Sequence, residues 1–246
     1  MNYKDYLTTR GYKPHAEALD TGALKLHHIK KQLKTYNPTY PNILMLIALD
    51  NKQYKTAILD SKQGLIAVPQ TPKQLLCQMT NQLDVMSHWM MRMIAKHKGI
   101  NEYVPYVYGG LSFSPLKTGE NGTQTWISTK EIDGRQEHND FHHLKIWFKG
   151  VPTAFIINAT EHFIFERSAD ANLIQRAHDS LIHQMNLATS LDFQESYNLF
   201  RVANFKESPL ALFSDIKEDV VKKAFKHAGY EFTDKDVEAV VKRCIE

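Results

Sequence analysis

The sequence predicts an α+β fold, with antiparallel β-sheet elements, a long helix between two β segments and a helical C-terminal region. Three observations support this class. Short β-branched runs divided by turn residues fill positions 43–68 and return between 103 and 158. Apolar residues at helical spacing run from 72 to 98. The remainder, from about residue 189, again has helical character.

Composition limits the classes of protein to which the chain can belong. It has 246 residues, 43% hydrophobic and 23% charged, which suits one large or two small globular domains. Its longest apolar run, Ile43–Leu49, is far shorter than the roughly 20 residues that span a membrane. The N-terminal residues contain no apolar signal-peptide core, and Cys77 and Cys244 are too few for a disulfide framework or a structural zinc site. We therefore expect a cytoplasmic protein with no membrane partner.

Charge is distributed unevenly along the chain. Residues 1–100 contain 14 lysines and arginines against 6 acidic residues, whereas residues 101–246 contain 16 against 21. A basic half beside an acidic half is found in proteins that bind nucleic acids. Lysines that only increase solubility would give the same pattern, so the asymmetry leaves both interpretations open.

Residues 1–40 are expected to form a basic N-terminal arm with a helix over residues 22–36. The apolar stripe of this helix and the lysines beside it are Leu24, Leu26, Ile29 and Leu33, and Lys25, Lys30, Lys31 and Lys34, respectively. The helix should end near Asn37, because the following proline disfavours helical geometry in the residue before it.

Residues 41–188 are expected to form an α+β domain that opens with an antiparallel meander. Its strands should cover residues 43–50, 55–60 and 65–68, which are separated by short polar turns. A helix should follow, with Thr71 as its N-cap and a proline in its first position.

The helix after the meander should run from about Pro72 to Lys98, with a break near Asp84 as the alternative. It ends in a group of cations, namely Arg92, Lys96, His97 and Lys98. Cations in a last turn before a glycine are an ordinary helix ending. The same cations could contact phosphate groups, so the cluster has both a structural and a functional interpretation.

The rest of the domain is expected to alternate between strands and turns before it becomes helical. The expected strands are 103–113, 124–129, 144–148 and 153–158. A polar loop should cover residues 133–141, and Ser168 should cap a helix over residues 169–187.

Residues 189–246 are expected to form a helical and more acidic C-terminal extension. Ser214 should begin a helix that ends at Gly229. Thr233 should begin the last helix, with Asp236 at the capping-box position as a shorter substitute for glutamate.

No motif in the chain indicates a specific chemistry. The residues that invite a metal interpretation are His138, Asp140, His142 and His143. They fall in a polar loop, and no further cluster with ligand spacing follows. The sequence also contains no phosphate-binding glycine-rich loop, nucleophile elbow, Cys-x-x-Cys, helix-turn-helix or zinc-finger signature. We therefore expect no metal, no cofactor and no enzyme activity.

Several short segments follow one another in a distinctive order. They are Lys55–Gly64, Thr71–Lys73, a helix ending at Arg92, Pro105, Leu111–Pro115, Thr125–Ser128, Val151–Thr160 and Gln175–Ala177. The most specific part is Phe113 and Pro115, then a turn, then Trp126-Ile127-Ser128. This order resembles the competence transcription factor (ComK) family of Firmicutes over roughly residues 40–188.

The resemblance implies a function and partners. Members of this family bind A·T-rich double-stranded DNA through the minor groove, activate genes for DNA uptake, and are held down by an adaptor and protease complex. It therefore implies a transcriptional activator of competence, with A·T-rich double-stranded DNA and an adaptor–protease regulator as partners. A second copy of the chain, in a homo-oligomer, is a further candidate partner. The family's Gly-Ser-Ser-Tyr-x-Gly-Arg segment corresponds here to Met86–Arg92, and the chain beyond about residue 190 has no counterpart.

We predict that six basic side chains contact DNA: Arg92, Lys96, Lys98, Lys30, Lys31 and Lys34. They would neutralise phosphates, and the first three could also enter a narrow minor groove. The alternative is a protein-interaction module or adaptor in a regulatory pathway, without direct DNA binding, built on the acidic C-terminal helices and the methionine-rich helix.

Overall fold

The computed structural model describes residue 7 and residues 18–81, 88–108, 110–116, 123–138, 142–189, 209–227, 229 and 231–243. The chain forms two compact units. The first unit contains residues 1–88 and 101–173, and the second contains residues 89–100 and 174–246. The expected α+β class is confirmed, because a helical segment lies in the chain between two groups of strands and further helices follow the last strand.

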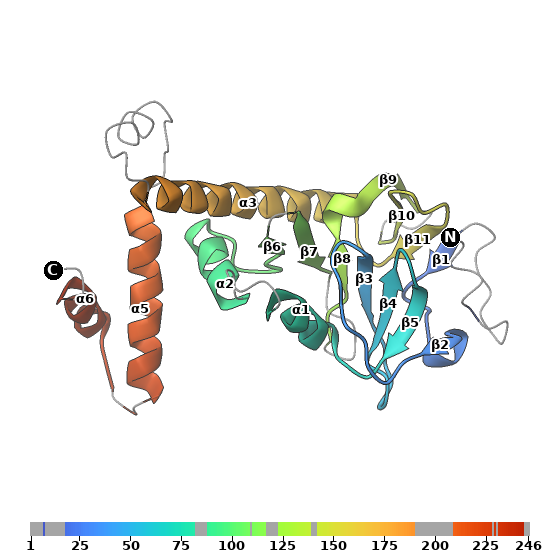
Figure 1. The fold of residues 1–246 in the computed structure, drawn as a ribbon, viewed down its shortest axis with the longest axis horizontal. Helices are drawn as coiled ribbons and strands as arrows, with labels where there is room; N and C mark the ends of the chain where they lie inside the picture. Colours follow the sequence, from blue (N-terminus) through green and yellow to red (C-terminus); the bar gives the residue numbers. More distant parts are fainter. Residues whose placement is uncertain are drawn as a thin grey trace. The chain divides into compact units, whose positions relative to one another are not determined.

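The first unit is built on two β-sheets (Figure 1). The larger sheet has seven strands in the order β2-β5-β4-β3-β8-β7-β6. These strands are β2 (Lys31–Gln32), β3 (Ile43–Ala48), β4 (Thr56–Asp60), β5 (Gly64–Val68), β6 (Tyr106–Tyr108), β7 (Leu111–Pro115) and β8 (Trp126–Ser128). Strands β3, β4 and β5 form the antiparallel meander expected from the sequence, and β2 joins the edge of the sheet parallel to β5.

The smaller sheet has four strands in the order β1-β11-β10-β9. They are β1 (Ala18–Asp20), β9 (Ile132–Glu137), β10 (Leu144–Phe148) and β11 (Ala154–Ile157). Strands β10 and β11, which the sequence predicted over residues 144–148 and 153–158, pair as an antiparallel hairpin. The polar loop expected from residue 133 is wrong as far as residue 137, because these residues pair with β10 as an edge strand whose side chains are mostly exposed.

The two sheets share one hydrophobic core. Residues from β3, β4, β5 and β8 cluster there with residues from β1, β10 and β11 and with the beginning of the following helix. Alternate residues of β10 (Leu144, Ile146 and Phe148) are buried, whereas Lys145 and Trp147 between them are partly exposed. This period-two burial is typical of a sheet with one face in a core.

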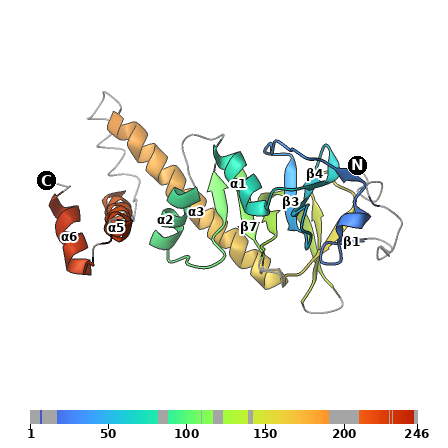
Figure 2. The same ribbon diagram turned by 90° about the horizontal axis from the view of Figure 1, so that it is seen from below.

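Helix α1 (Pro72–Asn81) contacts β3 of the larger sheet (Figure 2). Its expected N-cap is confirmed. The Thr71 hydroxyl accepts a hydrogen bond from the Gln74 amide at 3.2 Å, and Oε1 of Gln74 accepts one from the Thr71 amide at 2.8 Å. This reciprocal pair is a capping box. A second helix, α2 (His88–His97), follows, and residues 82–87, where the break was the alternative, lie outside the described residues.

The helix expected over residues 22–36 is wrong. This stretch contains the end of the turn after β1, one 3₁₀ turn η2 (Leu26–His28) and strand β2. Lys31 and Gln32 pair with Ile66 and Ala67 of β5, and the Leu33 amide donates to the Ala67 carbonyl at 2.9 Å. Pairing with a distant strand has therefore overridden the local helical pattern.

Helix α3 (Glu161–Thr189) begins earlier than the sequence predicted. The hydroxyl of Thr160 accepts a hydrogen bond from the Phe163 amide at 3.1 Å and acts as the N-cap. Ser168, the expected cap, lies inside the helix and donates to the Ile164 carbonyl at 2.8 Å. A serine in a helix interior often makes this bond, so a serine alone does not mark a helix start.

The second unit ends in helices α5 (Pro209–His227) and α6 (Asp234–Arg243). Helix α5 begins before the predicted Ser214. The predicted capping box of α6 is confirmed, since the Asp236 carboxylate accepts from the Thr233 amide at 2.7 Å. An ion pair between Lys222 and Asp234 at 2.8 Å joins the two helices. Among the described residues, no helix combines the length and apolarity needed to cross a membrane.

Candidate nucleic-acid interface

Three of the six predicted cations lie together at an edge of the seven-stranded sheet. Lys31 begins the edge strand β2, and its ammonium group donates to Oε1 of Gln63 at 3.1 Å. Lys30 and Lys34 flank this strand and are exposed. These lysines therefore project from a sheet edge and not from the expected helix.

The segment after β2 is anchored by a buried hydrogen bond. The Tyr36 hydroxyl donates to Oδ2 of Asp60 at 2.5 Å, and Asp60 is only 1% exposed. The other carboxylate oxygen accepts from the amides of Lys62 and Gln63 at 2.8 and 2.7 Å. Burial, together with the hydrogen bond to Asp60, raises the pKa of Tyr36 above its ordinary value. This contact holds the lysine-bearing edge to the turn between β4 and β5.

The described residues from 18 to 81 carry a marked excess of positive charge. Their lysines, which we call the N-terminal lysines, are Lys25, Lys30, Lys31, Lys34, Lys52, Lys55, Lys62 and Lys73. The acidic residues in the same range are Asp20, Asp50 and Asp60. Asp60 is buried, and Asp20 accepts a hydrogen bond from the Gly22 amide at 2.8 Å. The sequence prediction named three of these lysines, and a count of lysine against aspartate over this range would have found the others.

Arg92 and Lys96 occupy the exposed side of α2, one helical turn apart. The buried residues of the described part of this helix are Met91, Met93, Ile94 and Ala95. Like charges four residues apart on a helix repel each other, so a bound anion would relieve this repulsion. These two cations belong to the second unit, whereas Lys30, Lys31 and Lys34 belong to the first.

The end of α2 has a structural explanation in its backbone. Gly99 adopts a φ of 76°, its amide donates to the Lys96 carbonyl at 2.9 Å, and the Ile100 amide donates to the Ala95 carbonyl at 2.9 Å. This is a Schellman ending, which favours glycine at the left-handed position. Lys98 immediately precedes that glycine, and partial burial lowers the pKa of its ammonium group. Lys98 is less exposed than Arg92 and Lys96.

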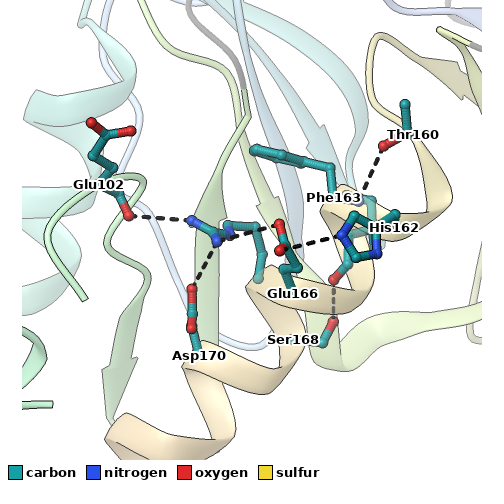
Figure 3. Close-up of polar contacts among 9 residues, drawn as sticks. Glu102, Thr160, His162, Phe163, Glu166, Ser168 and Asp170 are labelled. Atoms are coloured by element: carbon teal, nitrogen blue, oxygen red, sulfur yellow. Dashed lines mark hydrogen bonds and ion pairs between the residues drawn. The ribbon is translucent and has the colours of Figure 1, made fainter. Parts of the chain in front are cut away.

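Arg167, near the start of α3, is a cation engaged within the protein, and its partners Glu102, Glu166 and Asp170 are labelled in Figure 3. Its guanidinium donates to the Glu102 carbonyl at 3.2 Å, pairs with Asp170 at 3.0 Å and lies 3.8 Å from Glu166. It also lies over the Phe163 ring, 5.3 Å from the centroid. With its side chain 13% exposed, Arg167 fastens α3 to the segment before β6 and is not available to phosphate.

The most specific residues of the resemblance to competence factors are buried in the first unit. Phe113 is fully buried and pairs with Ser128, and Trp126 is 6% exposed and pairs with Pro115. Their burial and pairing give them a structural role in strands β7 and β8. Comparisons of the chain with protein-family models, with curated proteins and with solved structures found no match.

Proposed function

We propose that this chain binds double-stranded DNA as a transcriptional regulator of the competence-factor type, working in the cytoplasm. The observation that carries the proposal is the excess of N-terminal lysines over accessible carboxylates in residues 18–81. Recognition of A·T-rich sites through the minor groove, and activation of genes for DNA uptake, rest on the sequence resemblance alone.

Phosphate contact accounts for this arrangement of charge in physical terms. Of the three aspartates in that range, Asp60 is buried under Tyr36 and Asp20 is engaged by its own turn. Only Asp50 is exposed, so lysines outnumber accessible carboxylates within residues 18–81. A duplex carries closely spaced negative charges, and each lysine that neutralises a phosphate releases condensed counterions.

The test is a titration of A·T-rich and G·C-rich duplexes with the full chain at several salt concentrations. Fluorescence anisotropy of the labelled duplex measures binding. Each phosphate contact contributes about 0.9 to the slope of log affinity against log salt. Changing Lys30, Lys31 and Lys34 together to glutamine should therefore reduce the slope by up to about 2.7. The pair Arg92→Gln and Lys96→Gln should reduce it by up to about 1.8.

A matched control removes the same kind of charge from another part of the chain. Lys226 and Lys235 are exposed residues of the second unit, and changing both to glutamine should leave the slope unaltered. Binding that does not respond to salt would contradict the proposal, as would a triple variant that behaves like this control. Equal affinity for the two duplexes would contradict only the proposed preference for A·T-rich sites.

An interaction module without DNA binding is the second candidate, and an apolar patch on α3 favours it. Phe165 is 62% exposed and Leu173 is 40% exposed, on one side of the helix with Ala169 between them. Exposed apolar side chains that gather in this way often mark a contact with another protein. Reversing Arg92, Lys96 and Lys98 to glutamate separates the two functions, since only DNA binding should be lost.

A further inference from the structure

A cleft of about 680 Å³ lies in the first unit, between segments that are remote in sequence. Its walls come from the residues between β1 and η2, from the end of β3 and the turn after it, from both sides of the β7–β8 connection and from the residue after β11. A volume of this size is typical of sites for small molecules. Lys25 is the one N-terminal lysine in this lining, and it is not among the six predicted DNA contacts.

Part of the lining of the cleft is apolar, and we call this part its floor. Leu24, Ile47 and Leu116 line it, and they are 6%, 2% and 4% exposed. All three belong to the core that the two sheets share, so the floor is held rigidly by packing on its inner side. A ligand with an apolar group would remove further apolar surface from water here.

Several polar groups of the lining are already engaged within the protein. The Thr21 hydroxyl donates to the Ile156 carbonyl at 2.9 Å, and the Thr125 hydroxyl oxygen accepts from the Ala48 amide at 3.1 Å. Asn51 accepts two backbone amides of its own turn through its side-chain oxygen. These groups shape the walls and contribute little to the choice of ligand.

Three lining side chains remain uncommitted. They are the Lys25 ammonium, the Asp50 carboxylate and the Asn158 amide, and within the described part of the chain none has a hydrogen-bond or ion-pair partner. Lys25 and Asp50 thus bring opposite charges to one cleft without pairing with each other. A ligand that carries both charges would satisfy each of them, and its apolar part would lie on the apolar floor.

We propose that this cleft binds a small zwitterion with an apolar side chain, of the kind found in free amino acids and short peptides. Its carboxylate would pair with Lys25, its ammonium with Asp50, and its apolar side chain would lie on Leu24, Ile47 and Leu116. The volume exceeds that of one amino acid, so a short peptide fills the cleft better. This inference does not depend on DNA binding.

The test is calorimetric titration of the full chain with leucine and with the tripeptide Ala-Leu-Ala. The tripeptide should bind more tightly than leucine. If leucine binds as tightly as the tripeptide, the ligand is a free amino acid and not a short peptide. N-acetylated and C-amidated forms of the tripeptide each lack one charge. Each should bind about fivefold more weakly, which corresponds to an ion pair of about 1 kcal/mol.

Two variants assign each charge to its residue. In Asp50→Asn the free and acetylated peptides should bind alike, whereas the amidated peptide should still bind more weakly. In Lys25→Met the free and amidated peptides should bind alike, and acetylation should still weaken binding. The control Lys52→Met removes an exposed lysine outside the cleft and should change nothing. Absence of tripeptide binding, or capped peptides that bind as well as the free one, would overturn the proposal.

Discussion

Replacing Tyr36 by phenylalanine removes the hydroxyl that holds the lysine-bearing sheet edge to the turn between β4 and β5. Tyr36 and Asp60 are 8% and 1% exposed, so water cannot readily replace the lost donor. A hydrogen bond to a charged group contributes about 1.5–3 kcal/mol. Asp60 keeps the amide donors of Lys62 and Gln63, so we expect the free energy of unfolding to fall by about 2 kcal/mol.

Urea unfolding followed by tryptophan fluorescence measures this loss, because Trp126 and Trp147 both belong to the first unit. With a denaturant slope of about 2 kcal/mol per molar urea, the midpoint should fall by about 1 M while the slope stays the same. The matched control is Tyr54→Phe. Tyr54 is 9% exposed, but its hydroxyl has no hydrogen-bond partner among the described residues. Equal midpoints for the two variants would refute the reasoning.

Two further predictions concern other buried polar groups of the first unit. Arg167→Met should lower the free energy of unfolding by about 2 kcal/mol in the same urea assay. The substitution removes the ion pair of Asp170 and the hydrogen-bond donor of the Glu102 carbonyl. An unchanged midpoint would show that these contacts are not formed in solution. Burial raises the pKa of Tyr106 to about 12, so the unfolded chain loses this proton above about pH 10 while the folded chain retains it. The stability of the protein should therefore fall between about pH 10 and pH 12. Melting curves of Tyr106→Phe should show a smaller fall over that range. An equal fall in the two proteins would show that Tyr106 does not cause this pH dependence.

Elements with local chemical signals were predictable from the sequence. The Thr71–Gln74 capping box, the Thr233–Asp236 box and the strands of the meander are fixed by residues close together in the chain. Strand β9 was missed because its exposed residues have no apolar alternation, and only its pairing with β10 makes it a strand. The stretch over residues 22–36 was misassigned for the same reason, since β2 depends on β5.

The candidate interface was predictable in charge but not in geometry. Lys30, Lys31 and Lys34 were identified from composition, whereas their position on a sheet edge follows from the pairing of β2 with the distant strand β5. The cleft gave no signal, because Lys25, Asp50 and Asn158 are brought together only by the packing of distant segments. A charge pattern is visible in one stretch of sequence, but a cavity is formed by several stretches that lie far apart in the sequence.

The position of β1 has a consequence for the way this chain is made. β1 pairs in parallel with β11, and the Thr21 hydroxyl reaches the Ile156 carbonyl across 135 positions of sequence. During synthesis, residues 18–20 leave the ribosome long before their partner strand exists. The meander can form early from neighbouring segments, but the smaller sheet cannot close until Ile157 has emerged. Contacts over such separations form slowly, so β1 remains without its partner strand until β11 has emerged.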